Sequence, residues 1–193
     1  MIKPKHLLKE SNNEAVGMAL RHYWNFVLNA LSGHNPDSYY RQYRKEIEFI
    51  ADALKKKYGP TSGDTAWRGI ILDPSEVHNG KVNHVEDITY VSFTEDKRIA
   101  IAFGDTENPM AEFMMSRYPN KKGYLITADW RLDILLFHWK WMDDANMWPA
   151  VEQLFGDAIK YMKMQKELIL KPKPYYHVEP IPPGASGGLE VGT

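Results

Sequence analysis

The sequence predicts an α+β fold in which two N-terminal helices lead into a mixed or antiparallel β-sheet core. The chain has 193 residues, which is enough for one compact domain with a buried core. Its first third places apolar residues at steps of three and four, the spacing of a helix with one buried face. After residue 60, short apolar runs lie between turn residues, which is typical of strands. Helices followed by several short strands favour the α+β class.

The two predicted helices span residues 16–31 and 39–58. A Ser-Gly pair follows the first helix and a Gly-Pro pair follows the second, and such residues commonly end helices. Both helices carry aromatic residues on their apolar faces, which we interpret as core packing. Residues 1–60 are therefore expected to form a helical lead-in that packs on the rest of the protein.

The remaining predicted elements are short, and most are bounded by Gly, Pro, Asn or Asp. We expect strands at residues 67–72, 88–93, 123–128, 168–170 and 175–178, and helices at residues 95–103, 109–118 and 151–162. Together they make up a core from residue 61 to residue 179. The segment 180–193 is rich in Pro and Gly, so we expect it to be a flexible tail.

The composition excludes several classes of function. Because the chain has no cysteine, it has no disulfide framework, thiolate metal site or cysteine nucleophile. Its 24 Lys and Arg residues balance 25 Asp and Glu residues, so binding driven by overall charge is not expected. No two histidines have metal-ligand spacing and no phosphate-binding glycine motif is present, so we expect no metal. The chain also lacks a secretory signal and a membrane-length apolar run, which favours the cytoplasm, including that of a host cell.

Three short segments are informative when they are taken together. They are Trp67-Arg68-Gly69, Ser92-Phe93-Thr94 and Gln165-Lys166-Glu167. The arginine lies in an apolar strand, the hydroxyl residues end a strand, and the glutamate opens an apolar run that ends at proline. In this order they resemble the Arg, Ser-Thr-Ser and Glu-x-Glu elements of the mono-ADP-ribosyltransferases related to bacterial toxins such as cholera toxin. The resemblance covers residues 66–178 and implies a β-sandwich core of that family with NAD as the substrate.

The resemblance also implies which residues bind NAD. Arg68 would hold the ribose and diphosphate through the fixed donors of its guanidinium. Gly69 would let the nicotinamide amide approach the backbone closely. The ring of Phe103 would stack on the cationic nicotinamide, and helix core is the alternative interpretation of this ring. The candidates for a second arginine on the diphosphate are Arg98, Arg117 and Arg21.

The catalytic side of the resemblance depends on a carboxylate. Breaking the bond between nicotinamide and ribose generates an oxocarbenium-like sugar, whose charge a carboxylate stabilises. The resemblance assigns this role to Glu167, with Ser92 orienting it and Thr94 supporting the strand end. The chain departs from the family at Phe93, in the middle of the Ser-Thr-Ser element. It also departs at Gln165, where an amide favours an asparagine or guanine acceptor over arginine.

Two features leave alternatives open. A lysine cluster near Gln165 is either a solvated face or a docking surface for an acidic protein or a nucleic acid. Its members are Lys160, Lys163, Lys166 and Lys171. The helix predicted at 151–162 is in register with residues 166 and 169. If that helix continued, Glu167 would lie on a helix and the predicted site would be lost.

The first functional hypothesis is a mono-ADP-ribosyltransferase that modifies a host or target protein, as expected of a toxin-like effector or a viral enzyme. An NAD glycohydrolase, in which water is the acceptor, would use the same residues. A guanine-directed nucleic-acid ADP-ribosyltransferase is a further alternative. A non-catalytic interaction protein with the same motifs is the alternative from another class, because fold does not determine function.

Overall fold

The computed structural model describes residues 4–31, 37–59, 65–83, 91–131, 135–144, 165–171 and 173–189. Within these ranges it is an α+β protein, in which helices pack around an antiparallel sheet. The helix predicted at 151–162, together with Lys160 and Lys163, lies outside the described residues. In the part of the chain that the structure describes, no helix is long and apolar enough to cross a membrane.

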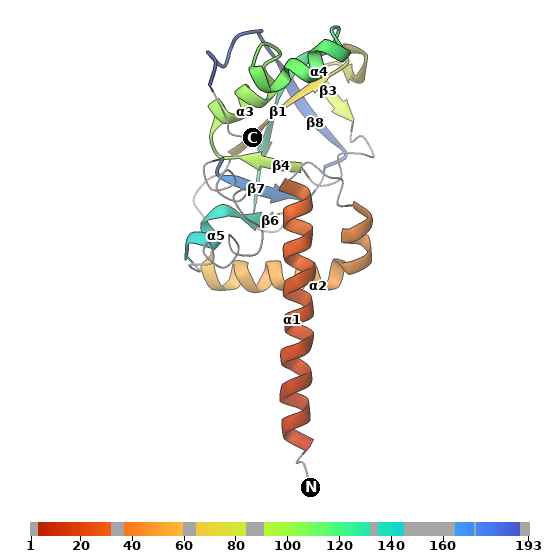
Figure 1. The fold of residues 1–193 in the computed structure, drawn as a ribbon, viewed down its shortest axis with the longest axis vertical. Helices are drawn as coiled ribbons and strands as arrows, with labels where there is room; N and C mark the ends of the chain where they lie inside the picture. Colours follow the sequence, from red (N-terminus) through yellow and green to blue (C-terminus); the bar gives the residue numbers. More distant parts are fainter. Residues whose placement is uncertain are drawn as a thin grey trace.

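The chain begins with two long helices, α1 (Pro4–Leu31) and α2 (Asp37–Tyr58). α2 agrees with the predicted helix and is kinked at Tyr43. α1 begins well before the predicted start, because its first residues are mostly polar and form a helix without an apolar repeat. Figure 1 shows this first part extending away from the body, whereas the other end of α1 reaches the sheet.

The described strands form one sheet of eight strands, and every pairing in it is antiparallel. Their bounds are β1 (Thr65–Leu72), β2 (Val77–His78), β3 (Lys81–Asn83), β4 (Val91–Thr94), β5 (Lys122–Asp129), β6 (Leu135–His138), β7 (Glu167–Leu170) and β8 (Tyr175–Ile181). The order across the sheet is β2-β3-β8-β5-β1-β4-β7-β6. The predicted mixed or antiparallel core is therefore antiparallel among these strands.

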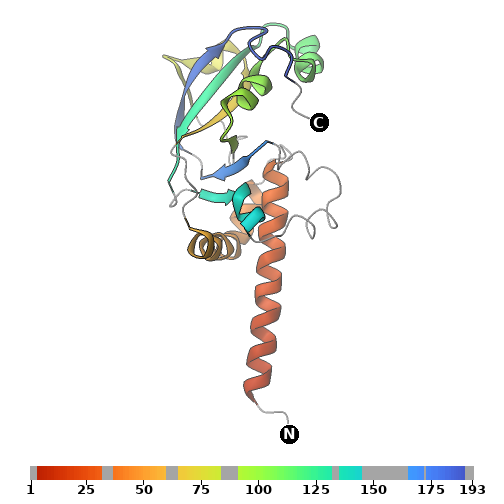
Figure 2. The same ribbon diagram turned by 90° about the vertical axis from the view of Figure 1, so that its left-hand side faces the viewer.

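The sheet changes direction between β1 and β4. Figure 1 shows β4 and β7 running across the molecule, with β1 slanting through the part above them, and Figure 2 shows the same strands from the side. The register of β1 on β4 joins a single pair, Trp67 and Thr94. The two strands therefore meet over a short length next to Arg68.

Three short helices complete the described fold: α3 (Lys97–Gly104), α4 (Glu112–Arg117) and α5 (Trp139–Asp144). Two short 3-10 helices lie at Pro74–Glu76 and Pro109–Ala111. α3 lies directly on the sheet through glycines. A Cβ atom on Gly69 would be 1.8 Å from the Ala100 carbonyl oxygen, and one on Gly123 would be 1.9 Å from that of Gly104. Backbone therefore touches backbone at these positions, which only glycine permits.

The two long helices are fixed to β6 and β7 by a common core. Tyr23, Phe26 and Ile47 from the helices are buried in one cluster with Phe137 and Ile169 from the strands. The hydroxyl of Tyr23 also donates a hydrogen bond of 2.9 Å to a backbone carbonyl of β6. The lead-in helices thus pack on the sheet, and their buried aromatic residues are core, as predicted.

The sequence interpretation missed two parts of the sheet. The β2–β3 hairpin turns at Asn79-Gly80, where both residues have positive φ. An Asn-Gly pair is the usual signal for such a turn, so this hairpin was predictable. β6 and the following α5 were also missed, because all four residues of β6 are buried and give no alternating pattern.

The C-terminal segment differs from the predicted flexible tail. Residues 180–181 belong to β8, and residues 182–189 form turns that fold back toward α3. The buried carboxylate of Asp105 accepts the backbone N–H groups of Gly184 and Ser186, both at 2.8 Å. Composition predicted a tail because the residue that holds this segment lies 79 positions away from Gly184 in the chain.

Candidate active site

The candidate site lies where β1, β4 and β7 meet. In the antiparallel register of β4 and β7, Ser92 is opposite Ile169 and Thr94 is opposite Glu167. Because alternate residues share a face, Ser92, Thr94 and Glu167 lie on the same side of the strands. Ser92 is diagonal to Glu167, and its Oγ donates to Glu167 Oε1 at 3.3 Å. Glu167 opens a strand, which excludes the alternative that it lies on a helix.

Arg68 reaches the same point from β1. Its Nη1 donates a hydrogen bond of 3.0 Å to the carbonyl oxygen of Ser92. Arg68 and Ser92 are 24 residues apart in the chain, and Ser92 and Glu167 are 75 residues apart. The structure therefore brings together the three residues that the resemblance selected. We call Arg68, Ser92 and Glu167 the triad.

Burial dominates the electrostatics of the triad. Glu167 is 7% exposed, and burial raises its pKa to about 8, although the hydrogen bond from Ser92 and the charge of Arg68 oppose this rise. Burial lowers the pKa of Arg68 to about 10, while Glu167 and Tyr176 act in the opposite direction. At neutral pH Arg68 is therefore charged, whereas Glu167 holds a proton most of the time. A cationic ligand beside Glu167 would favour its ionised form.

Two polar atoms of the triad are buried without a hydrogen-bond partner among the described residues. They are Nε of Arg68, a donor, and Oε2 of Glu167, an acceptor when it is ionised. Native proteins pair almost all such atoms, because an unpaired buried polar group costs free energy. The donor of Arg68 and the acceptor of Glu167 therefore leave hydrogen-bonding capacity unused at the place where β1, β4 and β7 meet.

The turn at residues 165–166 leads directly into Glu167. Thr94 Oγ1 donates to the carbonyl oxygen of Gln165 at 2.6 Å, and the backbone N–H of Glu95 donates to that of Lys166 at 3.3 Å. Lys166 has a φ of 48°, which costs a non-glycine residue roughly 1–2 kcal/mol. The contacts from β4 therefore hold this 165–166 turn in place, and the hydroxyl of Thr94 supports the strand end, as the resemblance implies.

Two residues predicted to contact nicotinamide have different surroundings. The backbone of α3 fills the space beside Gly69, so helix packing accounts for the glycine, and its contact with NAD stays a prediction. Phe103 lies in the last turn of α3 and is 37% exposed. Its ring is therefore not part of the helix core, and it is accessible to a ligand.

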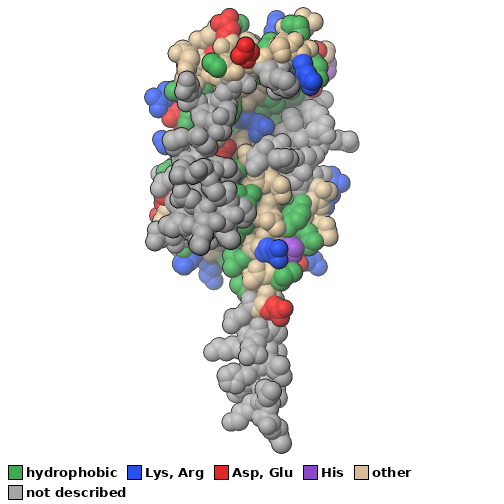
Figure 3. All heavy atoms as spheres, viewed as in Figure 1, with side chains coloured by type: hydrophobic (Ala, Val, Ile, Leu, Met, Phe, Trp, Pro, Cys, Tyr) green, Lys and Arg blue, Asp and Glu red, His purple; other side chains and the backbone are tan. Residues whose placement is uncertain are grey.

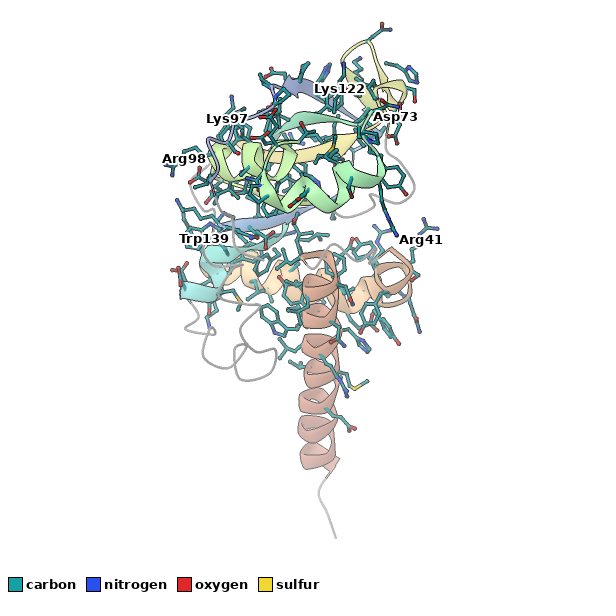
Figure 4. The ribbon with its side chains drawn as sticks, turned by 45° about the horizontal axis from the view of Figure 1, so that its top comes forward. Arg41, Asp73, Lys97, Arg98, Lys122 and Trp139 are labelled. Carbon is teal, nitrogen blue, oxygen red and sulfur yellow. The ribbon has the colours of Figure 1, made fainter. Side chains whose placement is uncertain are left out.

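The predicted lysine cluster is only partly described. Lys166 is exposed next to Gln165, whereas Lys171 Nζ lies 3.5 Å from Glu48 Oε1 of α2 and so joins the strand end to a helix. Arg98, a candidate for the second phosphate-binding arginine, bonds Asp96 at 2.9 Å, and Figure 4 shows it pointing outward from α3. In the same orientation as Figure 1, the space-filling view of Figure 3 shows a basic and an acidic side chain between the upper and lower parts of the molecule.

Sequence reasoning missed a second group of polar residues beside the turn. Glu95 Oε2 accepts a hydrogen bond of 2.8 Å from Trp139 Nε1, and its Oε1 lies 3.3 Å from Nε2 of the buried His138. We call Glu95, His138 and Trp139 the clamp. Glu95 could have been considered from the sequence, because it directly follows the Ser-Phe-Thr segment. His138 could not, because it ends β6, a strand that shows no alternating pattern.

Comparisons of the chain with protein families, with curated proteins and with solved structures found no match. In the ranges that the structure covers, no three His, Asp or Glu residues are grouped so that they could hold a metal ion. The functional interpretation therefore depends on the geometry and electrostatics of the site itself.

Proposed function

We propose that this protein is an NAD-dependent mono-ADP-ribosyltransferase that transfers ADP-ribose from NAD to a protein acceptor. The observation that carries the proposal is the triad, in which the buried atoms Arg68 Nε and Glu167 Oε2 have no hydrogen-bond partner among the described residues. The ribose hydroxyls of NAD supply both a donor for the carboxylate and an acceptor for the guanidinium. The antiparallel sheet with two lead-in helices is, in this proposal, a core of the ADP-ribosyltransferase type.

The proposed reaction breaks the bond between C1′ of the ribose and the nicotinamide nitrogen. The electron pair of that bond neutralises the pyridinium ring, and nicotinamide leaves. C1′ then carries the positive charge of an oxocarbenium ion, which the carboxylate of Glu167 stabilises. The acceptor nucleophile bonds to C1′ and loses its proton to solvent water. Arg68 holds the ribose and diphosphate, and Ser92 keeps Glu167 oriented toward the ribose.

Charge also links NAD binding to the state of Glu167. A buried carboxyl with a pKa of about 8 is mostly protonated at neutral pH, and the protonated form cannot stabilise a cation. The positively charged nicotinamide ring of NAD lowers that pKa when it binds nearby. Substrate binding thus generates the ionised glutamate that the reaction requires. The exposed ring of Phe103 is the proposed stacking partner of nicotinamide.

The acceptor side is assigned to the turn before Glu167. The Gln165 amide lies two residues before the proposed catalytic carboxylate, and it can hydrogen-bond to an amide or a base edge but cannot remove a proton. This chemistry favours asparagine over arginine as the acceptor residue.

The test is incubation of the protein and a cell lysate with labelled NAD. The wild type should label a discrete protein band, and Glu167→Gln should lower this labelling by at least about 100-fold, because it removes the charge that stabilises the transition state. Glu179→Gln, which changes an exposed glutamate of β8 in the same way, is the matched control and should retain activity. Release of nicotinamide without labelling would indicate a glycohydrolase, and no NAD turnover would refute both enzymatic functions.

A further inference from the structure

The clamp spans the start of β7. In the sheet order, β7 lies between β4 and β6, and the 165–166 turn enters β7 at that end. Glu95 comes directly after β4, while His138 ends β6 and Trp139 begins α5. The side-chain bonds of Glu95 therefore connect the two strands that flank β7, at the level of the turn. Figure 4 shows Trp139 at the start of α5, on the same side of the molecule as Lys97 and Arg98 at the start of α3.

The geometry of His138 determines which of its nitrogens carries the proton. The backbone N–H of Lys140 donates to His138 Nδ1 at 3.2 Å, so Nδ1 is an acceptor. In the neutral ring the proton is then on Nε2, which donates to Glu95 Oε1. Both carboxylate oxygens of Glu95 thus receive a hydrogen bond, one from His138 and one from Trp139.

The surroundings of His138 leave its ring little freedom to move. Its exposed fraction is 0%, and three tryptophan rings surround it. Their centroids lie 5.5 Å away for Trp130, 6.1 Å for Trp139 and 6.4 Å for Trp141. The side chain of Glu95 is 13% exposed, so the pair is largely shielded from water. A shielded hydrogen bond to a charged group is stronger than one at the surface.

The clamp also fixes the backbone that holds the turn. Thr94 and Glu95 are consecutive, and they bond the consecutive carbonyl oxygens of Gln165 and Lys166. The side chain of Glu95 bonds His138 and Trp139, while its backbone N–H bonds Lys166, so one residue connects the clamp to the turn. The left-handed φ of Lys166 is unfavourable and persists only when such contacts hold it.

We propose that Glu95 is a positioning residue that, through His138 and Trp139, fixes the 165–166 turn and so controls transfer to the acceptor without contacting NAD. The proposal rests on the proposed function, in which Gln165 meets the acceptor and Glu167 acts on NAD. A residue that positions only the acceptor side affects transfer more than it affects hydrolysis of NAD by water. A displacement of about 1 Å in such a group can change a rate by about 100-fold.

The main test is Glu95→Gln, which preserves the shape of the side chain. An amide offers one acceptor oxygen, so one of the two donors of the clamp then faces an NH2 group. We expect transfer to the labelled band to fall by about tenfold or more, while nicotinamide release without acceptor changes by less than about threefold. Equal losses in both rates, or no loss in either, would overturn the proposal.

Two further variants allow the proposal to be tested even if Glu95→Gln does not fold. Trp139→Phe removes a single donor and keeps an aromatic ring, so it should show the same split between transfer and hydrolysis to a smaller extent. Glu179→Gln is the matched control and should leave both rates unchanged. A melting temperature within a few degrees of the wild type shows that a variant is folded, and a split in any folded clamp variant supports the proposal.

Hydrogen exchange separates this proposal from the proposed function. In the wild type, the amide of Glu95 donates to Lys166 and should be protected from exchange. Glu95→Gln should reduce protection at residues 95 and 165–167 and leave it unchanged in β5 and β8. If the wild type showed no NAD turnover, the proposed function would fail, but this loss of protection would still support the positioning role. Unchanged protection would overturn it.

Discussion

The triad and the clamp lie on either side of the same turn, and they differ in how their polar atoms are paired. Arg68 Nε and Glu167 Oε2 are buried atoms, yet neither has a hydrogen-bond partner among the described residues. In the clamp, both oxygens of Glu95 and both ring nitrogens of His138 are paired. Both groups contain a largely shielded carboxylate beside a potential cation, so charge alone does not explain the difference.

This difference in hydrogen-bond pairing indicates that the triad and the clamp have different roles. Unpaired buried atoms cost stability, and a carboxylate and a guanidinium with such atoms side by side are typical of a functional site. Paired buried atoms hold elements in a fixed arrangement. The pKa values agree with this contrast. Burial raises the pKa of Glu167 to about 8. For Glu95 burial also acts to raise the pKa, but hydrogen bonds from His138 and Trp139 outweigh it and leave the pKa below its usual value.

Arg68→Met should have the largest effect on NAD binding, so it is the sharpest test of the contrast between the triad and the clamp. NAD affinity should fall by about 100-fold, because the guanidinium supplies hydrogen bonds to the ribose and diphosphate. The unfolding free energy near pH 7 should change little, since the lost hydrogen bond from Nη1 to the Ser92 carbonyl is offset by removal of the unpaired, buried Nε donor. Calorimetric titration with NAD and urea unfolding measure the two quantities. A large loss of stability would mean that the triad is structural.

Glu167→Gln should show a second large effect, in the pH dependence of stability. The folded protein holds the proton of Glu167 more tightly, because its pKa is about 8 instead of 4.5. The stability that this tighter proton binding contributes is fully present below pH 4.5 and is lost as the pH rises through about 8. The variant has no such loss, so its stability relative to the wild type should increase by a few kcal/mol between pH 5 and pH 9.

Urea unfolding of both proteins at pH 5, 7 and 9 measures this difference. Glu179→Gln, at an exposed position, provides the control and should follow the wild type at each pH. A difference between Glu167→Gln and the wild type that does not vary with pH would show that Glu167 has an ordinary pKa.

Gln165→Glu tests the turn that separates the triad from the clamp. A carboxylate can orient and deprotonate a guanidinium, so the modified residues should shift toward arginine, while NAD hydrolysis changes little. Mass spectrometry of the labelled proteins identifies the modified residue types. The assignment of Gln165 to the acceptor side would be refuted by an unchanged set of modified residues.

Lys166→Gly should have the smallest effect. Glycine adopts a positive φ without strain but loses more entropy on folding, so we expect a net gain in stability of about 0.5–1 kcal/mol. Thermal unfolding measures this gain. Asn79→Gly is the matched control, since Asn79 has a similar φ of 52° in the β2–β3 hairpin and asparagine tolerates that region better. An equal gain at both sites would argue against strain specific to the turn.

Much of the fold could be predicted because its signals are local. Periodic apolar residues identified α2 and most of α1, and turn residues bounded the runs that became β1, β5 and β7. Where no local pattern exists, prediction failed. β6 is buried along its whole length, and the segment after Ile181 is held by Asp105, which is distant in the chain.

The chemical types and the order of the candidate residues are properties of the sequence, since Arg68, Ser92 and Glu167 each lie in a short segment with a recognisable local pattern. Only the folded chain shows that Glu167 begins a strand and that the pairing of β1 with β4 brings Arg68 to the Ser92 carbonyl. It also decided the partners of each charge. Whether a shielded carboxylate has both oxygens paired, as Glu95 does, or has one open oxygen, as Glu167 does, depends on donors from strands and helices far apart in the chain, and no local pattern records them.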